Sequence, residues 1–204
     1  MTVARRLVSG SAALALVVGG VLLGRDLYLR AKGAVAAVLI DRAWDARLDD
    51  GGEHRPWPWA DFTPVARLEV ARLGIDAPIL SDATGRTLAF GLGRIVGSAA
   101  LDADRADRAP ESFGVAAIAG HRDTWAAFLE RLEVGDILIL RTGGTPRRFR
   151  VVGLEVVDAR TARAAPAAGA GAGAQARLLL VTCWPFGSTR RGAERFLVDC
   201  ALES

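Results

Sequence analysis

The residues best suited to chemistry in this chain are one cysteine, one histidine and one arginine. Cys183 ends the apolar run that begins at Leu178, and a Trp-Pro pair follows it directly. Because proline cannot continue a strand ladder, this pattern predicts a thiol at the end of a strand, within reach of a substrate. His121 lies upstream in the segment AGHRDT, and Arg195 starts a second apolar run twelve residues after Cys183. Together these groups indicate nucleophilic thiol chemistry.

Each of the three groups answers one need of acyl transfer. A free thiol, with a pKa of about 8.5, is mostly protonated at neutral pH and needs a partner that takes the proton or stabilises the thiolate. An imidazole such as that of His121 serves this purpose. A guanidinium is permanently charged and has several donors, so Arg195 suits an oxyanion or a substrate backbone. Arg190 and Arg191 are competing candidates for this cation.

The same residue types also have ordinary structural interpretations. A free cysteine is commonly a small core residue, and Cys200, inside the last apolar run, is interpreted in this way. The spacing also leaves open a bridge between Cys183 and Cys200, which would remove the nucleophile. His54, between charged residues of a predicted linker, is interpreted as inert. Since the chain has two cysteines and two histidines and no pair at zinc-ligand spacing, we expect no metal site.

The composition limits the classes of protein to which this chain can belong. The 204 residues, about half of them apolar and including 23 glycines, suit one turn-rich domain with an additional segment. The net charge of +3 comes from scattered arginines rather than from a basic patch interleaved with aromatic residues. We therefore expect no nucleic-acid partner. Two cysteines also exclude a disulfide framework as the basis of the fold.

The N-terminal segment is predicted to be a membrane anchor in contact with lipid. No charge interrupts the sequence from Leu7 to Gly24, and eighteen residues reach the lower limit for spanning a hydrocarbon core of about 30 Å. The run is longer than the apolar part of a usual signal peptide, which favours an uncleaved anchor. We expect an anchor over 1–32, a linker over 33–62 and a catalytic domain over 63–204. Charges flank the run on both sides, so charge counting does not orient it.

Beyond the linker, short apolar segments separated by turn residues predict a β protein. The linker itself must be irregular at Arg55–Trp59, where prolines alternate with tryptophans. Strands are expected over 65–70, 77–80, 113–119, 137–141, 148–157 (as one or two strands), 177–182 and 195–202. Short helical segments are expected over 84–90 and 124–132, and loops over 102–111 and the low-complexity stretch 164–176. Seven or eight strands with little helix predict a closed or nearly closed barrel.

At these motifs the chain resembles the sortase family of cysteine transpeptidases. The resemblance is specific at AGHRDT and VTCWPF and extends from about Arg67 to Asp199. The Gram-negative type, class GN, is the most similar, given the segments WPWADFTPVARLEV, TGRTLAFGLG and VVDAR. The resemblance implies an all-β fold, a closed eight-stranded sortase-type barrel with short helices, preceded here by one N-terminal transmembrane helix. It implies no cofactor.

The resemblance also assigns roles to the site. His121, Cys183 and Arg195 would be the catalytic trio, and Thr182 would orient substrate. Cys183 would attack the threonine carbonyl of a C-terminal Leu-Pro-x-Thr-Gly-like sorting motif, and His121 would protonate the leaving glycine amine. An amine acceptor would then resolve the thioester, while Arg195 holds the oxyanion or the backbone of the motif. The partners are thus a substrate protein that carries the motif and an amine nucleophile.

Two positions depart from the family pattern. Leu179 stands where the first threonine of the strand is expected, and Trp184 replaces a common tyrosine, so the preferred motif stays open. The resemblance implies a single-pass protein of the bacterial cytoplasmic membrane with an extracytoplasmic catalytic domain. On the residues alone, two alternatives stay open: a thiol peptidase that only hydrolyses its substrate, and a non-catalytic, membrane-tethered barrel that binds peptide.

Overall fold

The computed structural model describes residues 3–101, 114–161, 176–190 and 192–203, with residues 3–15 described by their backbone alone. The chain forms two compact units, residues 1–39 and residues 40–204. The loops expected over 102–111 and 164–176 lie outside the described residues, except for residue 176.

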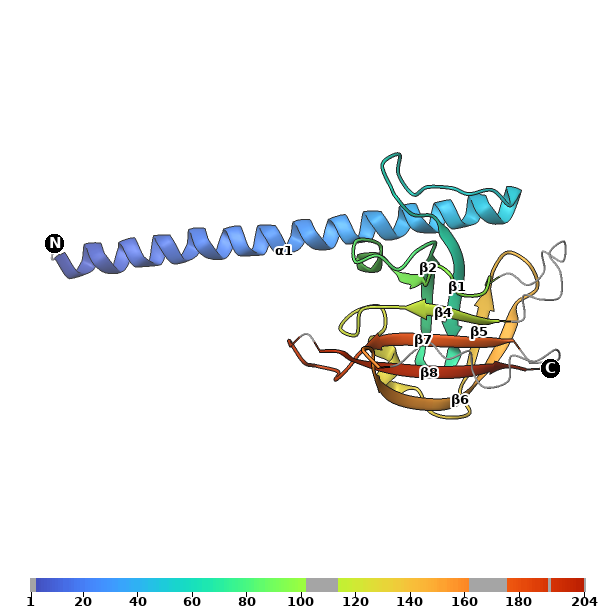
Figure 1. Cartoon of the computed structure of the whole chain (residues 1–204). Coiled ribbons are helices and arrows are strands. Elements are labelled where there is room, and N and C mark those ends of the chain that lie inside the picture. The colour runs from blue at the N-terminus through green and yellow to red at the C-terminus, as the bar shows by residue number, and fades with distance from the viewer. Residues whose placement is uncertain (1–2, 102–113, 162–175, 191, 204) are drawn as a thin grey trace. The chain divides into compact units, whose positions relative to one another are not determined.

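One long helix, α1 (Val3–Asp50), begins the chain (Figure 1). It ends at Gly51, whose φ of 72° lies in the left-handed region and whose N–H donates to the carbonyl of Arg47 at 2.8 Å. A glycine tolerates this conformation without the steric penalty of a Cβ, which makes it a common helix terminator. Among the described residues, no helix is both long and apolar enough to cross a membrane. The first half of the predicted anchor, from Leu7 to residue 15, lies outside the side chains that the structure describes.

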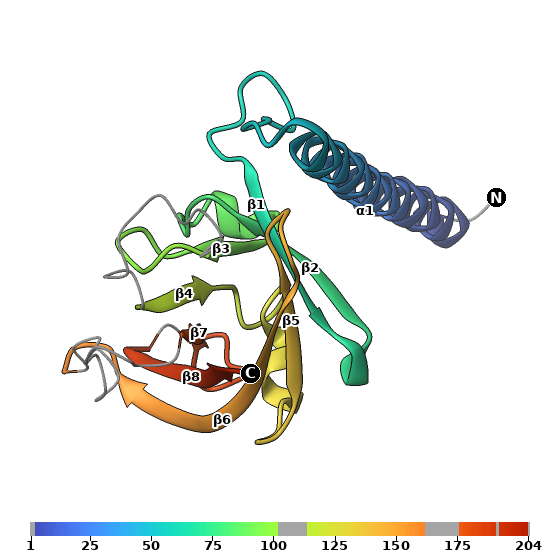
Figure 2. The ribbon, with the colours of Figure 1, turned by 90° about the vertical axis from the view of Figure 1, so that its right-hand side faces the viewer.

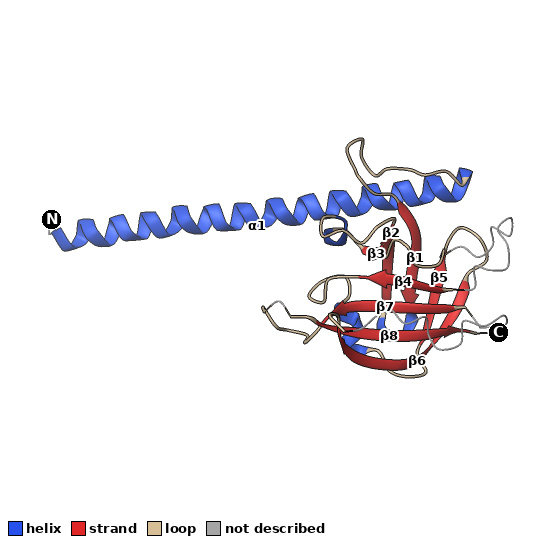
Figure 3. Cartoon of the chain, viewed as in Figure 1, coloured by secondary structure: helices blue, strands red, loops and turns tan. Residues whose placement is uncertain are grey.

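The remainder of the chain is a β-barrel with short 3-10 helices (Figure 3). Its strands are β1 (Pro64–Val70), β2 (Ile75–Leu80), β3 (Leu92–Arg94), β4 (Val115–Ala119), β5 (Ile137–Arg141), β6 (Arg147–Asp158), β7 (Arg177–Cys183) and β8 (Glu194–Leu202). The 3-10 helices are η1 (Ala71–Leu73), η2 (Thr87–Ala89) and η4 (Ala127–Arg131). The strands close in the order β1-β2-β3-β4-β7-β8-β6-β5, which confirms the predicted eight-stranded barrel.

Two pairings in the barrel are parallel, β2 with β3 and β4 with β7, and the others are antiparallel. Figure 2 shows the strands arranged around a common interior. Inward-facing residues alternate with outward-facing ones, as on β1, where Ala66, Leu68 and Val70 are fully buried. This period of two is the reason that the apolar alternation in the sequence located most strands correctly.

The three-residue strand β3 was not predicted. The glycines on either side of Leu92 were interpreted as the end of a helical segment, and a strand this short leaves no alternation to detect. Gly93 is nevertheless essential to the packing, because a Cβ there would lie 2.3 Å from the carbonyl oxygen of Asp82. The backbone of β3 therefore approaches the segment after β2 more closely than any side chain would allow.

The last three turns of α1, from Ile40 onward, belong to the same unit as the barrel. Ile40 is buried in an apolar cluster with Phe62 and Leu80, and Ala43 and Trp44 are also buried. Asp41 accepts a hydrogen bond of 2.6 Å from Arg67 on β1, which also donates to Asp76 on β2 at 2.8 Å. The segment predicted as a linker thus contributes buried side chains and an ion pair to this unit.

Candidate active site

The pairing of β7 with β8 places the cysteine and the arginine opposite each other. Cys183 is the last residue of β7, and Arg195 is its partner in the antiparallel register. Directly opposed residues of an antiparallel pair have Cβ atoms about 5 Å apart and point to the same face. The thiol and the guanidinium therefore start from neighbouring positions on one face of the barrel, at the end of β7.

The parallel pairing of β4 with β7 brings the histidine to the same end. Ala119 is level with Val181, and His121 follows Ala119 by two residues just as Cys183 follows Val181 by two residues. The ladder continues past β4, because the N–H of Gly120 donates to the carbonyl of Val181 at 3.1 Å. His121 is exposed at this rim. The structure thus gathers the three predicted residues at the adjoining ends of β4, β7 and β8, which lie side by side in Figure 1.

Thr182 links the ends of β4 and β7 on the inner side of the barrel. Its side chain faces the interior, is 2% exposed, and donates a hydrogen bond of 2.8 Å from Oγ1 to the carbonyl of Gly120. The contact that the structure shows is therefore with the backbone just before His121. Its role in orienting substrate stays a prediction.

An apolar strip leads along the outer face of the barrel toward the thiol. On β7 the burial alternates, with Leu178, Leu180 and Thr182 buried and their neighbours half-buried on the outside. The strip combines this outer face with those of the two adjacent strands: Ala117 and Ala119 on β4, Leu179 and Val181 on β7, and Leu197 on β8. The two alanines are small, so they leave room beside the larger side chains of β7.

Arg195 is held by the loop that precedes it. Its Nη1 donates to the carbonyls of Gly192 at 2.9 Å and Glu194 at 2.8 Å. Of the two competing arginines, Arg190 is exposed on the loop, and Arg191 lies outside the described residues. Because Arg195 alone of these arginines is paired with Cys183 across the ladder, the register favours it as the cation of the site.

The two cysteines have opposite environments, and both are free. Cys183 is partly exposed at the rim, whereas Cys200 is fully buried in the core. Burial raises the pKa of the Cys200 thiol to about 12, since a thiolate would lose its hydration there. The bridge that the spacing left open is wrong, because Cys200 is paired with Leu178, five residues from Cys183, and faces the interior. Among the described residues, no group of three or more possible ligands could hold a metal ion.

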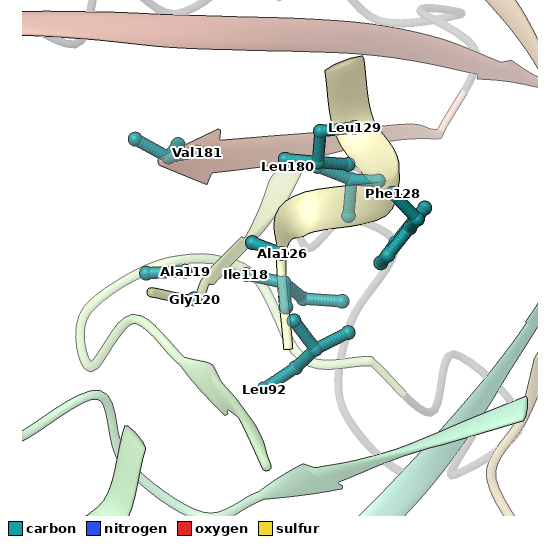
Figure 4. A pocket seen from close by; sticks show the side chains of 9 residues that line it. All are labelled: Leu92, Ile118, Ala119, Gly120, Ala126, Phe128, Leu129, Leu180 and Val181. Carbon is teal, nitrogen blue, oxygen red and sulfur yellow. The ribbon is translucent and has the colours of Figure 1, made fainter. Parts of the chain in front are cut away.

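A small apolar hollow, with no space for a water molecule, lies behind the segment that carries His121 (Figure 4). Nine residues from β3, β4, η4 and β7 and the turns beside them line it: Leu92, Ile118, Ala119, Gly120, Ala126, Phe128, Leu129, Leu180 and Val181. A Cβ on Gly120 would lie 2.7 Å from the side chain of Leu92 and 2.8 Å from that of Ala126. The glycine before His121 therefore lets η4 pack against the end of β4.

Sequence analysis missed an aromatic cluster beside the thiol. Trp184 stacks on Phe196 at 5.6 Å between ring centroids, and Phe186 meets both rings edge-on. The cluster fixes the start of the loop after Cys183 against the first residues of β8. It could not be read from spacing, because its members come together only in the register of β7 with β8. The burial of Arg122, next to His121, was missed as well.

Comparison with known proteins agrees with this geometry. A family model described as Sortase domain matches residues 68–203, so the chain belongs to the sortase family. Sortase A from Corynebacterium diphtheriae superposes with a TM-score of 0.58 at 18% identity, over 84% of this chain and 85% of that one. Sortase C1 from Streptococcus agalactiae gives a TM-score of 0.55 at 18% identity, over 69% and 68% of the two chains. A sortase E variant from Streptomyces avermitilis gives 0.51 at 26% identity, over 69% and 88%.

No curated protein matches the sequence. The resemblance to the sortase family is therefore confirmed by the family model, and the fold by the solved structures. The narrower resemblance to the Gram-negative class stays a prediction.

Proposed function

We propose that the chain is a membrane-anchored sortase, a cysteine transpeptidase that joins a substrate protein to an amine at the cell envelope. One observation carries this proposal, the register of three neighbouring strand ends. It sets Cys183 opposite Arg195 and brings the end of β4, two residues before His121, beside β7. A nucleophile, a proton-transfer group and a fixed cation are the parts that acyl transfer through a thioester requires.

The reaction then proceeds in two halves. The sulfur of Cys183 bonds to the threonine carbonyl carbon of the sorting motif, and the carbonyl oxygen takes the negative charge beside the guanidinium of Arg195. The carbon–nitrogen bond to glycine breaks as His121 gives its proton to the leaving amine, which leaves a thioester. An acceptor amine attacks the thioester, His121 takes its proton, and an amide forms as the thiolate leaves. The net change exchanges one amide for another and needs no cofactor.

The outer apolar strip supports a Leu-Pro-x-Thr-Gly-like motif as the substrate. An extended peptide rises about 3.3 Å per residue, so a leucine three residues before the threonine lies about 10 Å from the thiol. Along β7, the outward-facing residue nearest beyond this distance is Leu179, four residues or about 13 Å before Cys183 on the same face. Leu179 is directly opposite Asp199, which is paired with Arg177, so this end of the strip offers an aliphatic residue of the motif an apolar contact beside an ion pair.

The experiment that tests the activity uses the whole chain and a pool of Leu-Pro-x-Thr-Gly-like peptides, with intact mass as the readout. The proposal predicts an acyl adduct on the wild type and none on Cys183→Ala. Addition of glycine or hydroxylamine should convert the adduct to the amide or hydroxamate, with little free acid. A product that is only the free acid would favour the hydrolytic thiol peptidase. Binding of the peptide without any adduct would favour the non-catalytic barrel.

The location at the membrane rests on the uninterrupted apolar run from Leu7 to Gly24 and on the family. A bacterial cell that expresses the chain with a C-terminal tag should retain it in the membrane fraction after a high-pH wash. An external protease should reach the tag in spheroplasts, which places the barrel on the extracytoplasmic side. Recovery in the soluble fraction would contradict the anchor, and protection of the tag in intact spheroplasts would contradict the orientation.

A further inference from the structure

The arginine that follows His121 is buried, unlike the histidine beside it. Arg122 is 9% exposed, whereas His121 is exposed at the rim. The chain turns directly after His121, whose carbonyl accepts from the N–H groups of Thr124 at 3.2 Å and Ala126 at 3.0 Å, and within this turn Arg122 is directed inward. A buried guanidinium loses hydration and needs partners to offset that loss. The hydrogen-bond partners of Arg122 therefore indicate the role of this buried side chain.

The partners of Arg122 are main-chain carbonyls on a distant part of the chain. Its Nη2 donates to the carbonyl of Ser188 and, at 3.1 Å, to that of Arg190. Both carbonyls belong to the loop of residues 184–193, described at residues 184–190 and 192–193, which joins Cys183 to the start of β8. The only carboxylate close to the guanidinium is that of the exposed Asp123, whose Oδ1 lies 3.5 Å from Nε, among the residues that the structure describes.

This arrangement is poorly suited to a purely structural role. Nη1 of Arg122 is buried and has no hydrogen-bond partner among the described residues. A buried charge whose donors are only partly satisfied is a weak source of stability, and apolar side chains of similar size often replace such groups at little cost. What the side chain does accomplish is geometric: it ties the segment of His121 to the loop between the other two residues of the site.

The loop in turn determines where Arg195 lies. The guanidinium of Arg195 donates to the carbonyl of Gly192, near the end of the same loop, and to that of Glu194, the first residue of β8. The N–H of Trp184, at its beginning, donates to the carbonyl of Glu194 at 3.1 Å. A loop closed at its base in this way, and fastened at its tip by Arg122, presents Arg195 in one position relative to the thiol.

We infer that Arg122 is a positioning residue, which fastens the loop of residues 184–193 and thereby aligns Arg195 with Cys183 and His121. This inference rests on the proposed function for its effect on catalysis, but not for its effect on the loop. Without the hydrogen bonds from Arg122, the loop samples other positions, and Arg195 is no longer held in place to stabilise the oxyanion. Small displacements of such a group reduce rates strongly, by up to about a hundredfold for about 1 Å.

The first test measures the loop without reference to activity. Hydrogen exchange followed by mass spectrometry is compared for peptides that cover residues 184–194 in the wild type, Arg122→Met and Arg122→Lys. Exchange in this loop should accelerate in Arg122→Met and stay near the wild-type rate in Arg122→Lys, whose ammonium can still donate to the carbonyls. Arg148→Met, which removes an exposed arginine from β6, is the matched control and should leave the loop unchanged. Unchanged loop exchange in Arg122→Met would overturn the inference.

The second test measures acylation by a sorting-motif peptide. Arg122→Met should lower kcat about 10- to 100-fold with little change in KM, and Arg122→Lys should recover most of the loss. Because the effect passes through Arg195, the double variant Arg122→Met/Arg195→Met should be no slower than Arg195→Met alone. A full additional loss in the double variant would overturn the coupling.

Two further outcomes are also decisive. If Arg122→Met does not fold, Arg122→Leu, which also lacks a donor, takes its place with the same expectations, and melting temperature establishes that the compared proteins are folded. If the wild type forms no adduct with any peptide, the proposed function fails, and the loop exchange alone decides the role of Arg122.

Discussion

Two neighbouring strands each carry one cysteine, and the two thiols differ in almost every physical respect. Cys183 ends β7, is partly exposed and points to the outer face. Cys200 lies within β8, is fully buried and points to the core. The residue type is the same, so the difference in expected reactivity comes from the position in the strand and from the face that the residue occupies. A strand end is open to substrate, whereas a strand interior excludes both substrate and water.

The strongest test of this comparison removes each thiol in turn. Cys183→Ala should abolish acyl transfer, by at least about a thousandfold, because no other group at the rim can form the thioester. Its melting temperature should change little, since the side chain is not part of the core. Cys200→Ala should keep the activity of the folded protein. Equal activity of Cys183→Ala and the wild type would show that the thiol at the end of β7 is not the nucleophile.

The second prediction concerns stability. Cys200→Ser should lower the free energy of unfolding by about 1–3 kcal/mol, because a hydroxyl placed among apolar side chains must be desolvated without a good partner. Cys183→Ser, at the half-exposed rim, should cost less than about 0.5 kcal/mol. Urea denaturation of the two variants measures the difference. Similar losses in both would show that the two environments are less distinct than their burial indicates.

The third prediction uses pH. Burial raises the pKa of Cys200 to about 12 in the folded protein, above that of a free thiol, so the unfolded chain releases this proton first as the pH rises. Stability should therefore fall between pH 9 and 12, by roughly 1 kcal/mol for each pH unit. Cys200→Val lacks the group and should lose less stability over the same range. Parallel stability curves for Cys200→Val and the wild type would contradict the raised pKa.

The smallest predicted effect concerns the inward neighbour of the nucleophile. Thr182→Val keeps the shape of the side chain but removes the hydrogen bond to the carbonyl of Gly120. The buried carbonyl is then unpaired, and the free energy of unfolding should fall by about 1 kcal/mol. Thr182→Ser retains the donor and is the matched control. Thermal denaturation distinguishes the two, and a loss in Thr182→Ser as large as in Thr182→Val would show that the methyl group, rather than the hydroxyl, matters.

Much of the barrel could be predicted from sequence, because long strands such as β1 and β7 repeat apolar residues with a period of two. The strand β3 could not, since its three residues include a glycine whose role is close backbone approach. The candidate site was recognised from the scarcity of cysteine and histidine and from two motifs, but their proximity depends on a register between segments about 60 residues apart. The burial of Arg122 was also hidden, because an arginine in a polar segment is ordinarily solvated.

The parallel pairing of β4 with β7 has a consequence for how the candidate site is assembled from the chain. Parallel neighbours cannot be joined by a tight turn, so the chain between β4 and β7 must cross over, and here that crossover includes β5 and β6. Arg195 follows on β8, after the loop that begins at Trp184. The three candidate residues therefore come from segments that are distant in sequence, and a fragment that ends before β8 would contain the thiol and the histidine without the arginine.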